Sequence, residues 1–259
     1  MFLVGGRTLC NISNNTGAAC KTLMAGLFCL ALLLTPTRSQ AQSAFILSGF
    51  GGGGKTLYAY SGAILPLADR LDQTGPIARF WAKTYKFSYT ASLTPTTSTR
   101  IDATGWGLTG EAGYQWADDK LRIAGFAGLD YRHHNLSPND PGSNLKNKLG
   151  LFLSLDGTIP LSNTFGFDAN ANTSLAYNEV WLQARPYYQM SSGTKIGPDI
   201  AYISGPDFAF THLGLYGSGY KFTQKWLGTF YLGAEAGLQY DHDRGKYDPY
   251  GGTHLSFHF

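Results

Sequence analysis

The chain has 259 residues, of which 14% are charged and 14% are aromatic, and its formal net charge at neutral pH is +3. Ordinary soluble domains contain about 25% charged residues, so this composition is more typical of a β-sheet that faces lipid. The sequence has no basic run and no interleaving of basic and aromatic residues, and we therefore expect no nucleic-acid partner.

The first 41 residues have the pattern of a secretory signal peptide. Arg7 and Lys21 precede the apolar run 23–34, which is followed by the small-residue cleavage site Ser39-Gln40-Ala41. The run is shorter than the about 20 residues that a transmembrane helix needs. We therefore expect an exported protein whose leader is cleaved and whose mature domain comprises residues 42–259.

Cysteine usage limits the chemistry of the mature domain. All three cysteines precede the expected cleavage site: Cys10, Cys20 and Cys29. The mature chain would therefore have no thiol, which excludes disulfides, cysteine nucleophiles and cysteine metal sites. The sequence also contains no phosphate-binding loop, serine elbow or zinc signature, so we expect no cofactor and no metal.

After the leader, apolar and polar residues alternate with a period of two, which is the pattern of β-strands. Tight polar turns separate segments of about the ten-residue length of a tilted membrane strand. We expect about twelve strands, within a range of about ten to fourteen, at 44–51, 56–65, 77–89, 101–116, 120–134, 145–160, 165–177, 179–190, 195–205, 208–222, 226–240 and 249–259. The prediction is an all-β, antiparallel, up-and-down transmembrane β-barrel, closed because unpaired backbone groups in hydrocarbon cost several kcal/mol each.

Residue parity divides the clearer strands into an apolar and a polar face. In the segment 145–160 the apolar face consists of Leu149, Leu151, Leu153, Leu155 and Ile159. A membrane barrel turns such a face outward to lipid, whereas a soluble β-sandwich or lipocalin-like barrel turns it inward. Parity alone leaves both alternatives open. In the membrane barrel, the polar residues expected to face the lumen are Glu111, Arg122, Asp130, Arg132, His134, Arg185 and Glu235.

Loop lengths and the chain end also favour an outer-membrane barrel, whose short turns face the periplasm and whose longer loops face outward. Three odd-numbered connections are expected to be long outer loops: Thr90–Arg100, Asn135–Asn144 and Asp241–Asp248. The even-numbered connection Pro66–Pro76 is also long and breaks this alternation. The last segment alternates polar and apolar residues up to Phe259, like the terminal strand that the barrel assembly machinery recognises.

Titratable residues near the end of one segment suggest an alternative, enzymatic function. His133 and His134 lie close to Asp130, Arg132 and Ser137 in the sequence, as the parts of a hydrolase triad would. Adjacent residues of a strand point to opposite faces, so only one of the two histidines can join such a site. The alternative, non-catalytic interpretation is that these are solvated or salt-bridged polar residues.

The remaining titratable residues show no catalytic spacing. Glycoside hydrolysis needs a pair of carboxylates, but the candidate acids fall on separate segments: Glu111, Asp156, Glu179 and Glu235. We expect them to form salt bridges with interior arginines. His254 and His258 lie about 13 Å apart along a strand, which is too far to share a metal ion. An interior ring such as Tyr187 could stack on a sugar.

Three stretches resemble the cellulose biosynthesis protein BcsS family: Ile77–Tyr85, Gly105–Trp116 and Gly125–Pro141. The most specific piece is Asn135–Pro141, and the likeness covers nearly the whole mature chain in the same order. The turn Gly51–Gly54 departs from the family pattern. The family consists of bacterial envelope proteins associated with cellulose synthesis and has no established activity, so the resemblance implies a pathway and no mechanism.

These observations predict a non-enzymatic outer-membrane barrel that assists cellulose production through export, anchoring or positioning of the polymer at the cell surface. The expected partners are outer-membrane lipid, the barrel assembly machinery during insertion, and cellulose or components of the cellulose synthase complex. Side chains readily fill a barrel of about twelve strands, which favours anchoring over conduction. The alternatives are a barrel enzyme that modifies lipid or polysaccharide, and a small solute porin.

Overall fold

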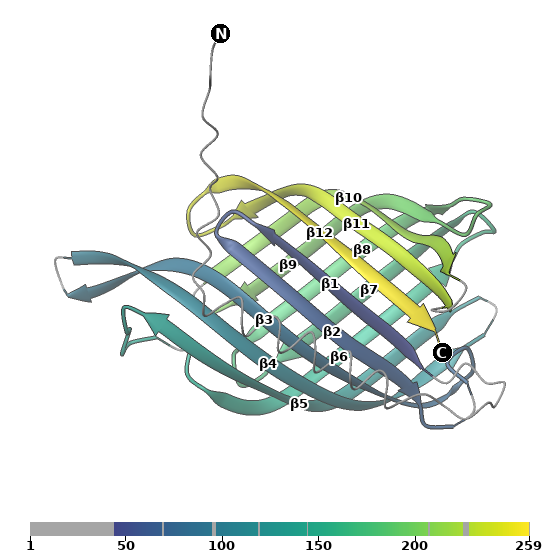
Figure 1. The fold of residues 1–259 in the computed structure, drawn as a ribbon, viewed down its shortest axis with the longest axis horizontal. Coiled ribbons are helices and arrows are strands. Elements are labelled where there is room, and N and C mark those ends of the chain that lie inside the picture. Colours follow the sequence, from purple (N-terminus) through teal and green to yellow (C-terminus); the bar gives the residue numbers. More distant parts are fainter. Residues whose placement is uncertain are drawn as a thin grey trace, which may run out of the picture. The chain divides into compact units, whose positions relative to one another are not determined.

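The computed structural model describes residues 44–258, apart from 69, 95–96, 119, 144, 207 and 225–227. The described residues form twelve β-strands (Figure 1), which are β1 (Phe45–Gly53), β2 (Thr56–Pro66), β3 (Gly75–Thr94), β4 (Thr97–Ala117), β5 (Arg122–Ser137), β6 (Lys148–Pro160), β7 (Phe165–Ser174), β8 (Glu179–Gln189), β9 (Lys195–Gly205), β10 (Phe208–Gln224), β11 (Gly228–Asp241) and β12 (Lys246–His258). Each overlaps one predicted segment. The predicted leader, its cysteines and Phe259 lie outside the described residues. Within the described part, no helix is long and apolar enough to cross a membrane.

The strands form a closed antiparallel barrel in which each strand pairs with its sequence neighbours. Closure is made by β1 and β12, whose ladder runs from the pair Phe45 and His258 to the pair Gly53 and Tyr250. The start of β1 and the end of β12 therefore lie at one end of the barrel, which we call the terminal end. The opposite end, which carries the β3–β4 turn, is the hairpin end (Figure 1). Closure leaves no unpaired sheet edge, as hydrocarbon requires.

The leucine face of β6 points away from the barrel interior. The exposed fractions of its side chains lie between 38% and 63% for Leu149, Leu151, Leu153, Leu155 and Ile159. On the opposite face of the same strand, Ser154 is buried. A soluble barrel would have the reverse arrangement, so the structure settles what parity left open: the apolar face is the outer surface of a transmembrane barrel.

Aromatic side chains flank this apolar surface at two levels. On β4, Trp106 and Trp116 both point outward and are exposed. The two positions are ten residue steps apart, which is about 33 Å along the strand, or about 25 Å across the membrane at a tilt of about 40°. Trp106 lies 5.5 Å from Tyr131, and Trp116 lies 4.9 Å from Tyr114, measured between ring centroids. These clusters fit the two aromatic girdles of a membrane barrel.

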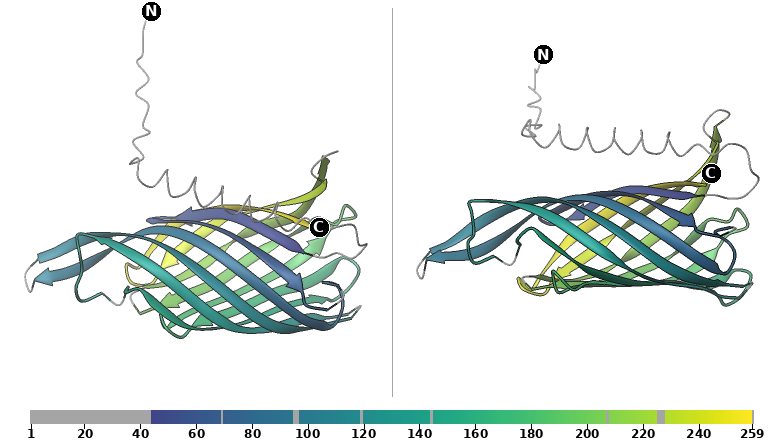
Figure 2. Two further views of the ribbon diagram at one scale, coloured as in Figure 1. Left: turned by 60° about the horizontal axis from the view of Figure 1, so that its bottom comes forward. Right: turned by 90° about the horizontal axis from the view of Figure 1, so that it is seen from below.

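Two of the three connections at the hairpin end that were predicted to be long are short. The expected loop Thr90–Arg100 is largely strand, because Thr90 pairs with Arg100 and the β3–β4 ladder continues to Thr94 and Thr97. This hairpin projects beyond the other strands (Figure 2). Likewise β12 begins at Lys246, which leaves a short β11–β12 connection. The connection between β5 and β6 is long as predicted, but it is shifted to residues 138–147. The prediction was therefore wrong for two of the three loops, because polar segments that pair as strands extend the ladders past the apolar belt.

Candidate functional site

The long connection between β2 and β3 folds over the terminal end of the lumen. Its Leu71 is only 5% exposed and forms a buried apolar cluster with Ile77, Ala124 and Phe126. The fully buried Gln115 holds the connection in place by donating a hydrogen bond of 2.8 Å to the carbonyl of Leu71. This apolar plug explains why an even-numbered connection is long: its residues fill part of the barrel interior.

Arg79 on β3 is the centre of the first of three ion-pair networks. Its Nε donates to Glu111 on β4 at 2.6 Å, and its Nη1 donates to Asp156 on β6 at 2.5 Å. Ser154 accepts from Arg79 and donates to the other oxygen of Glu111 at 2.6 Å. The Arg79 guanidinium also lies 3.8 Å from the centre of the Phe126 ring. The Arg79 network thus crosses the interior between strands that are not neighbours.

Arg132 on β5 organises a second network nearer the hairpin end. Its Nε donates to the fully buried Asp130 at 2.7 Å, and its Nη1 donates to Glu179 on β8. Asp130 also accepts from Thr109 at 2.9 Å and lies 3.5 Å from the Lys83 ammonium. Because β5 and β8 are separated by two strands, the Arg132 network also spans the interior.

Tyr177 in the turn 175–178 folds back over the Arg132 network. Its ring lies 4.4 Å from the Arg132 guanidinium carbon. Its hydroxyl donates to the carbonyl of Lys148 at 3.0 Å and accepts from the amide of the same residue at 3.0 Å. Burial raises the pKa of the Tyr177 phenol above its ordinary value. The turn between β7 and β8 is therefore latched to β6.

Arg185 on β8 is the centre of the third network. Its Nε donates to Asp199 on β9 at 2.7 Å, and its Nη2 donates to Glu235 on β11. Gln183 and Tyr250 add hydrogen bonds to the two oxygens of Asp199, at 2.9 Å and 3.1 Å. Paired buried charges of this kind avoid the cost of isolated ones. The three networks and the apolar plug together occupy much of the barrel interior.

Comparison with known families decides the pathway. The sequence model of the family described as "Cellulose biosynthesis protein BcsS" matches residues 48–259. The chain belongs to this family. Membership in the family associates the barrel with cellulose biosynthesis. The match covers all but the first few described residues. A search of curated proteins finds no match.

Solved structures similar to the BcsS-family chain are outer-membrane barrels. The KdgM porin is 11% identical, with 83% of this chain and 99% of that chain covered and a TM-score of 0.44. The translocator domain of autotransporter NalP from Neisseria meningitidis is 9% identical, with 95% and 98% covered and a TM-score of 0.46. Since both TM-scores are below 0.5, we draw nothing about function from these likenesses.

The structure distributes the seven predicted lumen residues of the BcsS-family barrel over separate places. Six lie in or beside the ion-pair networks: Glu111, Asp130, Arg132, His134, Arg185 and Glu235. Arg122 is exposed at the terminal end and donates to Gln115 at 2.9 Å. The sequence analysis missed Arg79 and Asp199 as network members. Strand parity could have found Arg79, since it alternates with the exposed Phe80.

The residues of the hypothetical hydrolase triad are not brought together. His134 points inward, where its Nε2 lies 2.8 Å from the Tyr85 hydroxyl. His133 points outward and its ring stacks on Trp106, with ring centroids 5.8 Å apart. Ser137 is exposed, and it shares the outward parity of His133. Within the described ranges, no group of three histidine, aspartate or glutamate side chains could hold a metal ion.

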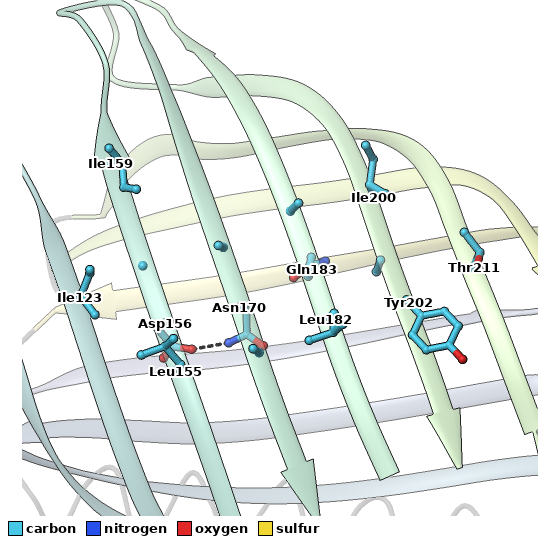
Figure 3. Close-up of a pocket in the computed structure, with 15 residues that line it drawn as sticks. Ile123, Leu155, Asp156, Ile159, Asn170, Leu182, Gln183, Ile200, Tyr202 and Thr211 are labelled. Carbon is cyan, nitrogen blue, oxygen red and sulfur yellow. Dashed lines mark hydrogen bonds between the residues drawn. The ribbon is translucent and has the colours of Figure 1, made fainter. Parts of the chain in front are cut away.

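Two cavities lie on opposite sides of the wall formed by β7 and β8. The outer one is an apolar groove of about 470 Å³, where alanines of these strands leave space between larger neighbours such as Leu155, Leu182 and Ile200 (Figure 3). It lies in the lipid-facing surface. The inner one measures about 140 Å³ and is lined by Asp168, Ala169, Asn170, Gln183, Arg185, Tyr216, Ser218 and His254. Its lining is mostly polar, unlike that of the groove.

Proposed function

We propose that this barrel is a non-enzymatic accessory of cellulose biosynthesis that resides in the outer membrane and anchors or positions the polymer at the cell surface. Family membership supplies the pathway. The observation that favours anchoring over conduction is the occupied interior, in which the apolar plug and the three ion-pair networks meet side chains of non-neighbouring strands.

The energetic argument against conduction rests on the buried charges. A path for a glucan chain would have to displace network side chains that cross the lumen, for example by separating Arg79 from Asp156. Breaking a buried ion pair costs about 3–5 kcal/mol when one partner stays buried and unpaired. This supports a structural or binding role, in which the polymer contacts the barrel without threading through it.

The proposed orientation places the terminal end in the periplasm and the hairpin end outside, as in bacterial barrels with an even number of strands. The projecting β3–β4 hairpin then extends from the outer surface. Outer-membrane lipid covers the apolar belt, and the barrel assembly machinery inserts the chain. Cellulose or a component of the synthase complex is the proposed functional partner.

Deletion of the gene tests this proposal. We expect surface cellulose to decrease, to detach more easily or to change its fibre texture, and the wild-type gene should restore it. A second strain carrying Tyr202→Phe, a conservative change on the lipid-facing surface, serves as a control for expression and insertion. Unchanged amount, attachment and texture of cellulose in the deletion strain would contradict the proposal.

A porin function is the second candidate, because the fold is a membrane barrel. It requires an open water-filled path, whereas the interior residues described above are largely paired with one another. Steady ion conductance of the purified protein would favour the porin over the accessory role.

A further inference from the structure

The inner cavity contains one of the three buried side-chain atoms that have no hydrogen-bond partner among the described residues. Tyr216 on β10 lines the cavity, and its side chain is only 5% exposed. Among the residues that the structure describes, its buried hydroxyl has no hydrogen-bond partner. Buried polar atoms in native proteins are almost always satisfied by protein, water or ligand. The unpaired hydroxyl of Tyr216 therefore indicates that something else occupies the cavity.

The charged groups around the cavity are already paired with one another. Lys195 pairs with Asp168 at 2.9 Å, and Arg185 pairs with both Asp199 and Glu235. Two cations thus face three carboxylates, which leaves an excess of negative charge. An anionic ligand such as a phosphate or a sugar acid would be repelled. The cavity is suited to a neutral ligand.

The cavity lining also presents uncharged hydrogen-bonding groups. Besides the Tyr216 hydroxyl, they include the Ser218 hydroxyl and the side-chain oxygen of Gln183, whose amide nitrogen is used by Asp199. Hydroxyls can donate and accept, and amide oxygens accept. A ligand with several neighbouring hydroxyl groups would satisfy all three positions, whereas an apolar ligand would satisfy none of them.

A flat ring provides the remaining surface of the cavity. His254 on β12 lies against the backbone of β11, since a Cβ atom at Gly233 would meet its Nε2 at 2.2 Å. Glycine at position 233 lets the imidazole approach the strand this closely. An aromatic ring attracts the weakly positive C–H edges of a bound molecule. A pyranose ring offers such C–H groups on its faces and hydroxyls on its rim.

We propose that the inner cavity binds one glucose unit at the end of a neutral β-glucan chain. The cavity volume of about 140 Å³ limits the site to a single ring-sized group. The polyhydroxylated, uncharged nature of the ligand follows from the cavity itself, whereas its assignment as a β-glucan rests on the proposed function. The site lies on the terminal-end half of β7, β8 and β12, which the proposed orientation turns toward the periplasm. The glucan end that it binds is therefore on the periplasmic side, before the polymer emerges at the cell surface.

Binding of cellotriose to the purified full-length barrel in detergent tests the proposal by isothermal titration calorimetry. Tyr216→Phe removes only the unpaired hydroxyl, and we expect it to weaken cellotriose binding about three- to tenfold. Tyr202→Phe makes the same chemical change on the lipid-facing surface and should leave the affinity unchanged. Trigalacturonate, the charged probe, should bind at least tenfold more weakly than cellotriose.

The possible outcomes distinguish a failure of the proposed binding site from a failure of the proposed function. Cellotriose binding that is equal in wild type and Tyr216→Phe, or absent from both, overturns the site, because a water molecule then satisfies the hydroxyl. Tighter binding of trigalacturonate overturns the neutral ligand, and binding of maltotriose without cellotriose overturns the β-glucan. A Tyr216-dependent affinity for cellotriose in a protein whose deletion leaves cellulose unchanged supports the site and contradicts only the proposed function.

Discussion

The two halves of the barrel interior are built differently. On the side of β3 to β6, which we call the sealed half, every polar group of the Arg79 network has a partner, and Leu71 packs with apolar side chains beside it. Among the described residues of these strands, the buried atom without a partner is His134 Nδ1, which lies outside that network. On the side of β7 to β12, the Arg185 network borders a cavity in which the hydroxyl of Tyr216 has no partner among the described residues.

We interpret this difference as a division of roles: one half of the interior stabilises the fold and the other half can bind a ligand. A sealed, satisfied interior stabilises a fold, because every buried polar group removed from water is compensated. In a cavity with an unpaired hydroxyl, the desolvation of that hydroxyl is not compensated by a hydrogen bond, but space remains for a ligand. We therefore expect substitutions in the sealed half to change the free energy of unfolding, and substitutions in the open half to change binding.

The largest effect should come from Glu111→Ala. It removes the buried carboxylate that pairs with Arg79 and leaves Asp156 as the only carboxylate bonded to the guanidinium, so we expect the free energy of unfolding to fall by about 3 kcal/mol. Urea unfolding in lipid vesicles, followed by tryptophan fluorescence, measures the change. Asp102→Ala is the matched control, because its pair with Arg100 is exposed and should contribute no more than about 1 kcal/mol. Equal effects of the two substitutions would show that the buried ion pair contributes no more to the free energy of unfolding than an exposed one.

The apolar plug should give the next largest effect. Leu71→Ala leaves a hole in the cluster around Ile77 and Phe126, and we expect a loss of about 2 kcal/mol. Leu67→Ala changes an exposed leucine of the same connection and should change the free energy of unfolding by less than about 0.5 kcal/mol. If Leu67→Ala destabilises the barrel as much as Leu71→Ala, the connection does not act as a plug.

The latch at the hairpin end should contribute less. Tyr177→Phe removes the hydroxyl that bonds to Lys148, and we expect a loss of about 1 kcal/mol. Burial raises the pKa of Tyr177 in the folded state, so the unfolded chain ionises first, above about pH 10. The advantage of wild type over Tyr177→Phe is therefore complete below that pH and declines above it. An advantage that grows between pH 9 and pH 11 would contradict this account.

The smallest effect on stability should come from the open half. Tyr216→Phe removes a hydroxyl that makes no hydrogen bond within the described protein, so the free energy of unfolding should change by less than about 0.5 kcal/mol without ligand. Thermal and urea unfolding of the same sample measure it. A loss comparable to that of Glu111→Ala would mean that the hydroxyl has a structural partner.

Strand periodicity predicts the fold of this chain well, for a local physical reason. The alternation around Leu149 to Leu155 specifies both a strand and its two faces, and the antiparallel order follows from short connections. The direction of the apolar face is not local, because it depends on whether lipid or a core covers it. The projecting β3–β4 hairpin was missed for a related reason, since polar strands outside the membrane carry no apolar alternation.

The interior was predictable only as a set of polar residues. Parity places Glu111 and Arg185 on the polar faces of their strands, and a partner of each comes from the adjacent strand. Their further partners, Ser154 and Glu235, come from strands that are not neighbours. Which residues meet across the lumen depends on barrel closure and strand stagger, and neither can be predicted from a local sequence pattern. The same argument applies to Leu71. That the long β2–β3 connection fills the terminal end of the lumen follows only from the three-dimensional structure.

Planar-bilayer recording of the purified full-length barrel tests the central claim most directly, because the proposed role depends on an interior closed to conduction. Insertion is verified on the same sample by its heat-dependent mobility in gel electrophoresis, and a porin recorded under the same conditions confirms sensitivity. The account predicts no steady ion conductance for wild type. A steady, ohmic conductance through the inserted barrel would contradict it.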